Sequence, residues 1–227
     1  MYAVNHLEGF GTLLESGAKV TFLGSATPKT SGATSFTFSS QSFGQTVPAG
    51  AVLVMCLTSD ASGANRNYNG CTVNGNAASP NAVSPNGLTM VGIYQYVAPS
   101  DMSSATIVVS SNGTAGGCTL DMFMLENLQS TTPIGTFVTT GTTPANSDPT
   151  TTFSPTDTGN VAIAVALNIG TGAITWIGLD VQATQAMNVF AAHVATAAMG
   201  NDLETLIAIT ADCATPNRPR MAAAYWR

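Results

Sequence analysis

Charge is what this chain of 227 residues has least of. Six Lys or Arg and twelve Asp or Glu make up 8% of the residues, about a third of the share in a typical globular protein. The net charge is −6 and only two of the cations are lysines. Such a composition supplies no basic surface for a phosphate backbone, so we expect no nucleic-acid partner.

Long hydrophobic runs are also missing. No apolar run is longer than residues 161–167, which have the length of a strand and fall well short of the roughly 18 residues of a membrane-spanning helix. The opening Met1-Tyr2-Ala3-Val4-Asn5-His6-Leu7-Glu8 has neither the basic start nor the apolar stretch of a secretory signal. We therefore expect no membrane association, and synthesis in the cytoplasm without export by a signal peptide.

The spacing of the four cysteines matches no recognisable disulfide or metal-binding pattern. Cys56, Cys71, Cys118 and Cys213 include no Cys-x-x-Cys pair, so we expect no zinc site. Cys56 lies inside an apolar run and is interpreted as a small buried hydrophobic residue. A Cys71–Cys118 disulfide remains an open alternative, against which cytosolic assembly argues.

Hydroxyl-bearing residues and glycine are abundant instead, with 32 Thr, 19 Ser and 22 Gly. Hydrophobic residues reach 44%, which argues against disorder. Short segments rich in Val, Ile, Thr, Phe and Tyr are bounded by Gly, Pro and Asn, as β-strands are. The dipeptides that predict tight hairpin turns are Asn69-Gly70, Asn74-Gly75, Asn86-Gly87 and Asn112-Gly113.

The two halves of the chain carry the same order of strand signals. A Thr/Phe segment (Ser35-Phe36-Thr37-Phe38-Ser39; Thr151-Thr152-Phe153-Ser154) is followed in each half by an apolar run that starts near Val52 or Val161. Further along, a constant shift of 99 residues aligns Thr106 with Thr205 and Met122 with Met221. We interpret this as an internal duplication; convergent β patterning is the alternative.

The predicted fold is therefore all-β, with two tandem β-sandwich domains of jelly-roll or immunoglobulin-like topology and a short N-terminal arm. Residues 88–97 are expected to form a half-buried strand. The Ala-rich stretch 183–198 permits a helix by composition, but the repeat predicts a strand over residues 188–195. We place the arm at residues 1–18, the first domain at 19–130 and the second at 131–227, with the boundary within residues 127–134.

The N-terminal arm has no counterpart in the second half. Leu7, Phe10, Leu13 and Leu14 form one apolar stripe if the arm is helical, while Gly9 and Gly11 weaken a helix. We interpret these four residues as anchors that dock the protein into a larger assembly. The alternative is an added strand or flap packed on the first domain.

Recognisable catalytic and metal-binding motifs are missing. The two histidines, His6 and His193, are far apart, and His193 falls in an expected strand. A glycosidase needs two carboxylates in a cleft, and the nearest local pair, Asp202 and Glu204, more simply solvates the start of a strand. No acidic cluster supports a calcium site built from Asp148, Asp157 and Asp180. We expect no cofactor, no metal and no catalytic residues.

One loop is the best candidate for a binding surface. Arg66, Asn67, Tyr68 and Asn69 lie in a polar stretch in which amides surround an aromatic residue and a guanidinium. Such groups hydrogen-bond to sugar hydroxyls, and an exposed aromatic ring stacks on a sugar ring. An ordinary Asn-rich loop with a partly packed Tyr68 is the alternative. Trp176 is interpreted as core or inter-domain packing, and Trp226 as the seal of the last strand or a contact with another subunit.

A resemblance to a known type follows from four segments: Gly32-Ala33-Thr34-Ser35-Phe36-Thr37-Phe38, the apolar strand at Val52, Cys71-Thr72-Val73-Asn74-Gly75-Asn76-Ala77-Ala78, and Ala105-Thr106-Ile107-Val108-Val109. Together they resemble the β-sandwich virion surface proteins of tailed bacteriophages and prophage-like elements. The resemblance covers residues 20–128 well and 135–227 more loosely. It rests on β patterning and carries over no catalytic residue.

The resemblance implies a non-enzymatic particle component: a capsid decoration protein, a head spike or a tail-associated piece that aids host attachment. The expected partners are other virion proteins of the capsid or tail, further copies of the chain in a homo-oligomer such as a trimer, and a host surface glycan. The expected location is the virion. The alternatives are a secreted carbohydrate-binding or adhesin module, and a hydrolase with an unrecognised site.

Overall fold

The computed structural model describes residues 17–60, 63–139, 147–154, 159–169, 173–187, 192–199 and 207–227; side chains are described except over 185–207. All regular elements in these ranges are β-strands, so the all-β prediction is confirmed. Within the same ranges, no helix is long and apolar enough to cross a membrane. The expected docking residues Leu7, Phe10, Leu13 and Leu14 lie outside the described residues.

The described residues of the first half contain nine strands: β1 (Lys19–Ser25), β2 (Ala33–Val47), β3 (Val52–Asp60), β4 (Tyr68–Val73), β5 (Asn76–Ala77), β6 (Ser79–Val83), β7 (Thr89–Val97), β8 (Met102–Ala115) and β9 (Thr119–Glu126). The described strands of the second half are β10 (Gly135–Val138), β11 (Thr150–Phe153), β12 (Val161–Asn168), β13 (Ile174–Ile177), β14 (Asp180–Met187), β15 (Ala192–Met199), β16 (Ile207–Cys213) and β17 (Arg220–Trp226). Within the Ala-rich stretch that permits a helix, residues 183–187 belong to β14 and residues 192–198 to β15. Of the strand expected over residues 188–195, the structure describes residues 192–195, which lie in β15. Residues 127–134 carry no strand.

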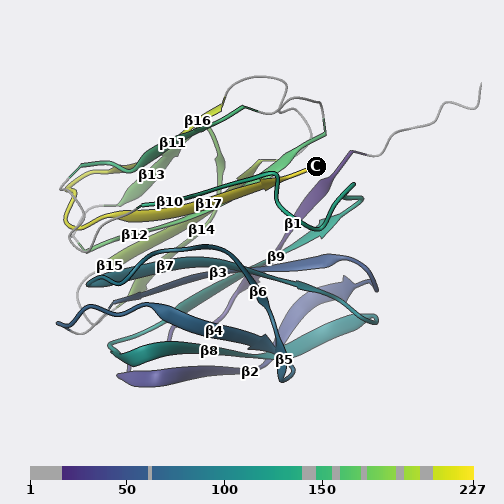
Figure 1. The fold of residues 1–227 in the computed structure, drawn as a ribbon, viewed down its shortest axis with the longest axis horizontal. Coiled ribbons are helices and arrows are strands. Elements are labelled where there is room, and N and C mark those ends of the chain that lie inside the picture. Colours follow the sequence, from purple (N-terminus) through teal and green to yellow (C-terminus); the bar gives the residue numbers. More distant parts are fainter. Residues whose placement is uncertain are drawn as a thin grey trace, which may run out of the picture.

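Four antiparallel sheets are stacked as layers (Figure 1). We call the sheet β2-β8-β4-β5 outer sheet 1 and the sheet β1-β9-β3-β7-β6 inner sheet 1. The second half supplies inner sheet 2, with the order β10-β17-β12-β15-β14, and outer sheet 2, with the order β11-β16-β13. The two inner sheets lie against each other at the middle of the molecule.

The two halves repeat one pattern of strand pairing. In the first half the first strand pairs with the last (β1 with β9), β2 pairs with β8, β3 with β7 and β4 with β5. In the second half β10 pairs with β17, β11 with β16 and β12 with β15. Strand for strand, inner sheet 1 and inner sheet 2 therefore have the same order.

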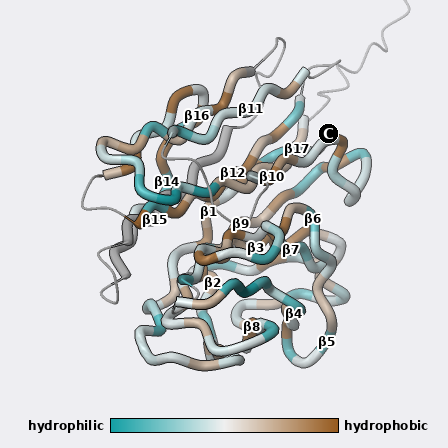
Figure 2. Tube along the Cα trace, turned by 60° about the vertical axis from the view of Figure 1, so that its left-hand side comes forward, coloured by the Kyte–Doolittle hydropathy of each residue, from teal (hydrophilic) through white to brown (hydrophobic). Residues whose placement is uncertain are grey.

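Each facing pair of sheets encloses its own core. Between outer and inner sheet 1 lie Phe36, Phe38, Leu53, Met55, Ile107, Leu120 and Met122. Between inner and outer sheet 2 lie Phe153, Ala164, Trp176, Ile209, Ala211 and Met221. Trp176 thus packs inside the second half, one of the two placements considered for it from the sequence. Figure 2 shows β4, in outer sheet 1, as a mostly pale to teal tube, as expected for a strand with one face in water.

A third core, which we call the central interface, joins the two halves. It contains Val52, Val54, Val91, Ile93, Phe123 and Leu125 from inner sheet 1 and Val161, Ile163, Val165, Leu167, Ala222, Ala224 and Trp226 from inner sheet 2. All of these side chains are at most 1% exposed. Burying one Val, Leu or Phe contributes about 1.5–3 kcal/mol before entropic costs, so the contact between the halves is as extensive as a domain core.

The central interface explains why the inner strands are buried on both faces. In β7, Met90 and Tyr94 face the first core while Val91 and Ile93 face the central interface. The prediction of a half-buried strand over residues 88–97 is therefore wrong, because a second sheet covers the face that was expected to meet water. The nearly continuous apolar sequences of β3 and β12 have the same cause.

One of the four Asn-Gly dipeptides forms the expected two-residue hairpin. Asn74 and Gly75 have φ angles of 50° and 83° and connect β4 directly to β5, as a type I′ turn requires. Asn69-Gly70 lies instead at a register irregularity inside β4. Asn112-Gly113 lies inside β8, and Gly87 belongs to an isolated bridge with Arg66. Gly87 and Gly113 leave room for the close approach of arginine side chains.

Candidate functional site

Backbone hydrogen bonds hold the loop that was predicted as a binding surface to the segments around Gly87 and Asn112. Arg66 and Gly87 exchange two backbone hydrogen bonds, with N···O distances of 2.8 and 2.9 Å. The amide N–H of Asn67 donates to Asn112 Oδ1 at 3.1 Å, and the amide of Asn112 donates to the carbonyl of Asn67 at 3.1 Å. The loop is therefore held on two sides, as a preorganised recognition loop needs to be.

Tyr68 points inward from this loop. Its ring is 3% exposed and belongs to the first core. Its hydroxyl donates a hydrogen bond of 2.8 Å to Ser59 Oγ, and burial raises the pKa of the phenol well above its ordinary value. The expectation that Tyr68 stacks on a sugar ring needs correction in this respect: the β-alternation of β4 turns its face into the core and away from solvent.

Arg66, Asn67 and Asn69 remain on the surface of the loop. Asn69 is exposed, while Arg66 and Asn67 are half-buried. Arg66 Nη1 donates to the carbonyl of Asn65 at 3.0 Å. The guanidinium rests against Gly113, where a Cβ would lie only 2.2 Å from Arg66 Nε, so Gly113 makes room for this arginine. The loop thus offers one guanidinium and several amides as hydrogen-bonding groups.

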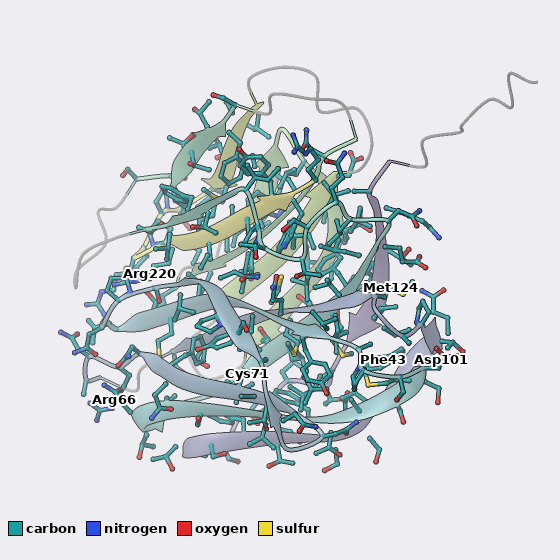
Figure 3. The ribbon with its side chains drawn as sticks, turned by 45° about the vertical axis from the view of Figure 1, so that its right-hand side comes forward. Phe43, Arg66, Cys71, Asp101, Met124 and Arg220 are labelled. Carbon is teal, nitrogen blue, oxygen red and sulfur yellow. The ribbon has the colours of Figure 1, made fainter. Side chains whose placement is uncertain are left out.

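The second half of the chain adds two arginines to the same edge of the molecule. The guanidinium of Arg220 lies against Gly87, where a Cβ would be 2.1 Å from Arg220 Nη2, and Nη1 donates to the carbonyl of Pro85 at 3.4 Å. Thr89 Oγ1 donates to the carbonyl of Arg218 at 3.3 Å. Figure 3 shows Arg66 and Arg220 along one edge. Three of the four arginines therefore contact the loop segment around Gly87 or its neighbour Thr89.

Arg220 is a buried residue that connects the two halves. It is 0% exposed, and burial lowers the pKa of its guanidinium. In β17 it occupies the face that carries Ala222, Ala224 and Trp226 toward the first half. The contact between Arg220 and Gly87 could not be predicted from the sequence, because an arginine beside Pro219 gives no local sign of burial. Only the pairing of distant strands brings it to residue 87.

The other residues considered from the sequence are placed elsewhere. All four cysteines are free and buried, so Cys71 and Cys118 are not bonded in this structure. Trp226 is buried in the central interface and donates from Nε1 to Gln95 Oε1 at 3.2 Å. His193 lies in β15, with its side chain outside the described set. Asp202, Glu204, Asp157 and His6 also lie outside the described residues.

The described residues hold no group of three or more His, Cys, Asp or Glu side chains that could bind a metal ion. Asp148 accepts a hydrogen bond from the amide of Cys213 at 2.8 Å, and Asp180 is exposed at the start of β14. Two surface hollows have no residue of the Arg66 loop in their lining. One, of about 340 Å³, lies between residues 48–52 and 125–131; the other, of about 400 Å³, lies between residues 28–31 and the start of β2.

In comparisons with known proteins, no family model, no curated protein and no solved structure matches this chain.

Proposed function

We propose that the protein is a non-enzymatic structural component on the surface of a bacteriophage particle, as capsid decoration, head spike or tail-associated protein. The observation that carries the proposal is the four-layer stack, in which two similar halves are joined through a fully buried face. A protein on a particle outside the cell depends on such non-polar burial for its stability. The low charge and the Thr- and Ser-rich outer sheets also fit this setting.

The proposal includes a finer description of the fold. Each half is a β-sandwich domain of jelly-roll type, and the two arose by internal duplication. The nested pairing of first with last strand in the first half supports the jelly roll, in which the chain wraps as a folded hairpin. The identical order of the inner sheets supports the duplication. Jelly rolls recur in viral capsid and lectin domains, which is an analogy of fold.

We further propose that residues 1–18 dock the protein onto other virion proteins through Leu7, Phe10, Leu13 and Leu14. The proposal is supported by contacts that hold Gly17 and Ala18, the described end of this segment, against the second half. The amide of Ala18 donates to the carbonyl of Gly159 at 3.2 Å, and a Cβ at Gly159 would lie 3.3 Å from the Cα of Gly17. The described end of the segment thus lies where the two halves meet, because Ala18 belongs to the central interface.

A carbohydrate-binding or adhesin module is the second candidate, favoured by the Arg66 loop. Its guanidinium and amides can hydrogen-bond to the hydroxyls of a host surface glycan, and the loop is held in place by Asn112 and Gly87. Asn69→Ala would weaken glycan binding in this case, whereas Tyr68→Phe, which changes a buried group, would leave it unaltered. A glycan array probed with the purified protein and these two variants tests this candidate.

The particle proposal is tested on the culture that produces the protein. Particles released by lysis are banded in a density gradient, and the fractions are analysed by immunoblotting and mass spectrometry. The proposal predicts that this chain co-sediments with the major capsid or tail proteins at a fixed ratio. Recovery of the chain only from the soluble fraction or the cell surface, with particle bands free of it, would overturn the proposal and favour the secreted module.

A further inference from the structure

The hollow of about 400 Å³ beside the start of β2 has a lysine in its wall. It is lined by Lys29, by the hydroxyl-bearing Thr30, Ser31, Ser35 and Thr37, and by three non-polar residues that include Pro28. Its volume lies within the range of small-molecule sites in proteins. The lining contains no Asp or Glu, so the single formal charge in the wall of the hollow is positive.

Contacts at both ends hold Lys29 in place. Its backbone amide donates to the carbonyl of Cys118 at 2.9 Å, and its carbonyl accepts from the amide of Cys118 at 2.8 Å. Its ammonium lies 5.5 Å from the centroid of the buried Phe38 ring, within the range of a cation–π contact. A cation that is positioned before the ligand arrives loses less conformational freedom on binding.

No acidic side chain among the described residues balances the charge of Lys29. The other lysine, Lys19, forms an ion pair with Glu126 at 3.4 Å. In the described part of the chain, the Lys29 ammonium has neither such a pair nor a hydrogen-bond acceptor for its three N–H donors. Lys29 is half-buried, and a half-buried cation without an acceptor favours an anionic ligand.

We propose that the hollow beside Lys29 binds a sugar that carries one carboxylate, such as a uronic acid. The carboxylate accepts hydrogen bonds from the Lys29 ammonium. The sugar hydroxyls pair with the Thr and Ser hydroxyls of the lining, because hydroxyl groups both donate and accept hydrogen bonds. The non-polar side of the sugar ring packs against Pro28.

Charge and size favour this ligand over other anions. One ammonium balances one carboxylate, whereas a phosphate group carries a charge of about −1.5 to −2 at neutral pH. A small inorganic anion would contact Lys29 and leave most of the hollow empty. The chain has a net charge of −6, but salt screens exposed charges beyond about 8 Å at physiological ionic strength. The charge of the lining therefore decides which ligand binds.

This sugar-acid site is separate from the Arg66 loop, because no residue of that loop lines the hollow. It is an additional property of the molecule and requires neither a particle nor the adhesin candidate. A test on the purified protein therefore has an outcome that does not depend on either proposed function.

The test is a titration of the isotope-labelled full chain with methyl β-glucuronide, followed by two-dimensional NMR. The matched neutral probe is methyl β-glucoside, which carries a hydroxymethyl group in place of the carboxylate. A single sugar ring makes few contacts, so we expect a dissociation constant on the order of 1 mM for the glucuronide. The signals that shift should belong to residues 28–37. The glucoside should bind at least about tenfold more weakly, because it lacks the charged hydrogen-bond acceptor.

Two variants with the same change in charge separate the hollow from the rest of the surface. Lys29→Gln removes the ammonium from the hollow and should weaken glucuronide binding at least about tenfold. Lys19→Gln removes the ammonium that pairs with Glu126 and should leave the binding unchanged. Thermal unfolding verifies that both variants are folded. The wild type gives an independent readout, since its affinity for the glucuronide should fall several-fold between about 0.05 and about 0.5 M salt.

The following results would overturn the sugar-acid site. The first is the absence of shifts at residues 28–37 up to about 20 mM glucuronide, well above the expected dissociation constant. Equal binding of the glucoside, undiminished binding by Lys29→Gln, or no effect of salt would also contradict it. Inorganic phosphate that binds as tightly as the glucuronide would indicate a general anion site. Shifts confined to the Arg66 loop would contradict this site and support the adhesin candidate.

Discussion

Trp226 Nε1 donates a hydrogen bond to Gln95 Oε1 at 3.2 Å across the central interface. Asn81 Nδ2 donates to the same oxygen at 2.9 Å. The last strand of the chain is thus fastened to β7 of the first half by a polar contact inside a non-polar layer. The contact predicts that the two halves depend on each other for stability.

Replacing Trp226 should destabilise the whole molecule and not only the second half. Trp226→Ala removes a fully buried ring, at a cost of about 3–5 kcal/mol in the free energy of unfolding. Urea unfolding followed by far- and near-ultraviolet circular dichroism should show one transition that moves to lower urea. Two transitions, of which only one moves, would mean that the halves fold separately. Exposed Ile177→Ala, as control, should change the free energy by less than about 0.5 kcal/mol.

The contact between Gly87 and Arg220 predicts that a larger residue at position 87 destabilises the protein. A methyl group in Gly87→Ala would lie 2.1 Å from Arg220 Nη2, and the buried guanidinium has little room to move. We expect destabilisation of about 1–3 kcal/mol. In the double variant with Arg220→Met, which removes the clash, the cost should be less than the sum of the single costs. Strict additivity in denaturant titrations would contradict the contact. Gly32→Ala, where the nearest atom is 3.3 Å away, is the control.

Buried thiols predict a loss of stability at high pH. Burial raises the pKa of Cys71 and of Cys118 from 9.0 to about 12. Because the folded state keeps these protons longer, the contribution is complete below pH 9 and is lost as the pH rises toward 12. The slope is about 1.4 kcal/mol per pH unit for each thiol. Urea titrations between pH 8 and 11 should show this fall, and Cys71→Ala should make it shallower. An equal slope in that variant would contradict the prediction.

Removal of the N-terminal segment separates docking from folding. Deletion of residues 1–16 preserves Gly17 and Ala18, including the hydrogen bond to Gly159. We expect an unchanged unfolding midpoint and loss of the protein from purified particles. Deletion of residues 1–18 removes that bond as well and serves as the comparison. A shorter chain that unfolds would show that the segment is structural, and one that still enters particles would show that docking lies elsewhere.

The positions of the strands could be predicted from the sequence more accurately than the burial of their two faces. The apolar runs of β3 and β12 and the Asn74-Gly75 turn depend on neighbouring residues, and they were predicted correctly. The burial of Thr89 and Gln95 in β7 depends on β12 and β17, which lie more than 60 residues away in the chain, so it was missed. The same reason accounts for Arg220 and Gly87. Tyr68 was assigned to an exposed loop because its neighbours are polar, but it begins β4 and faces the core.

The virion proposal is tested most directly by immunogold electron microscopy of the producing culture, with an antibody against this chain. We expect gold label on the heads or tails of released particles, and the position of the label identifies the part of the virion. Label on cell surfaces or free in the medium, next to unlabelled particles, would contradict it.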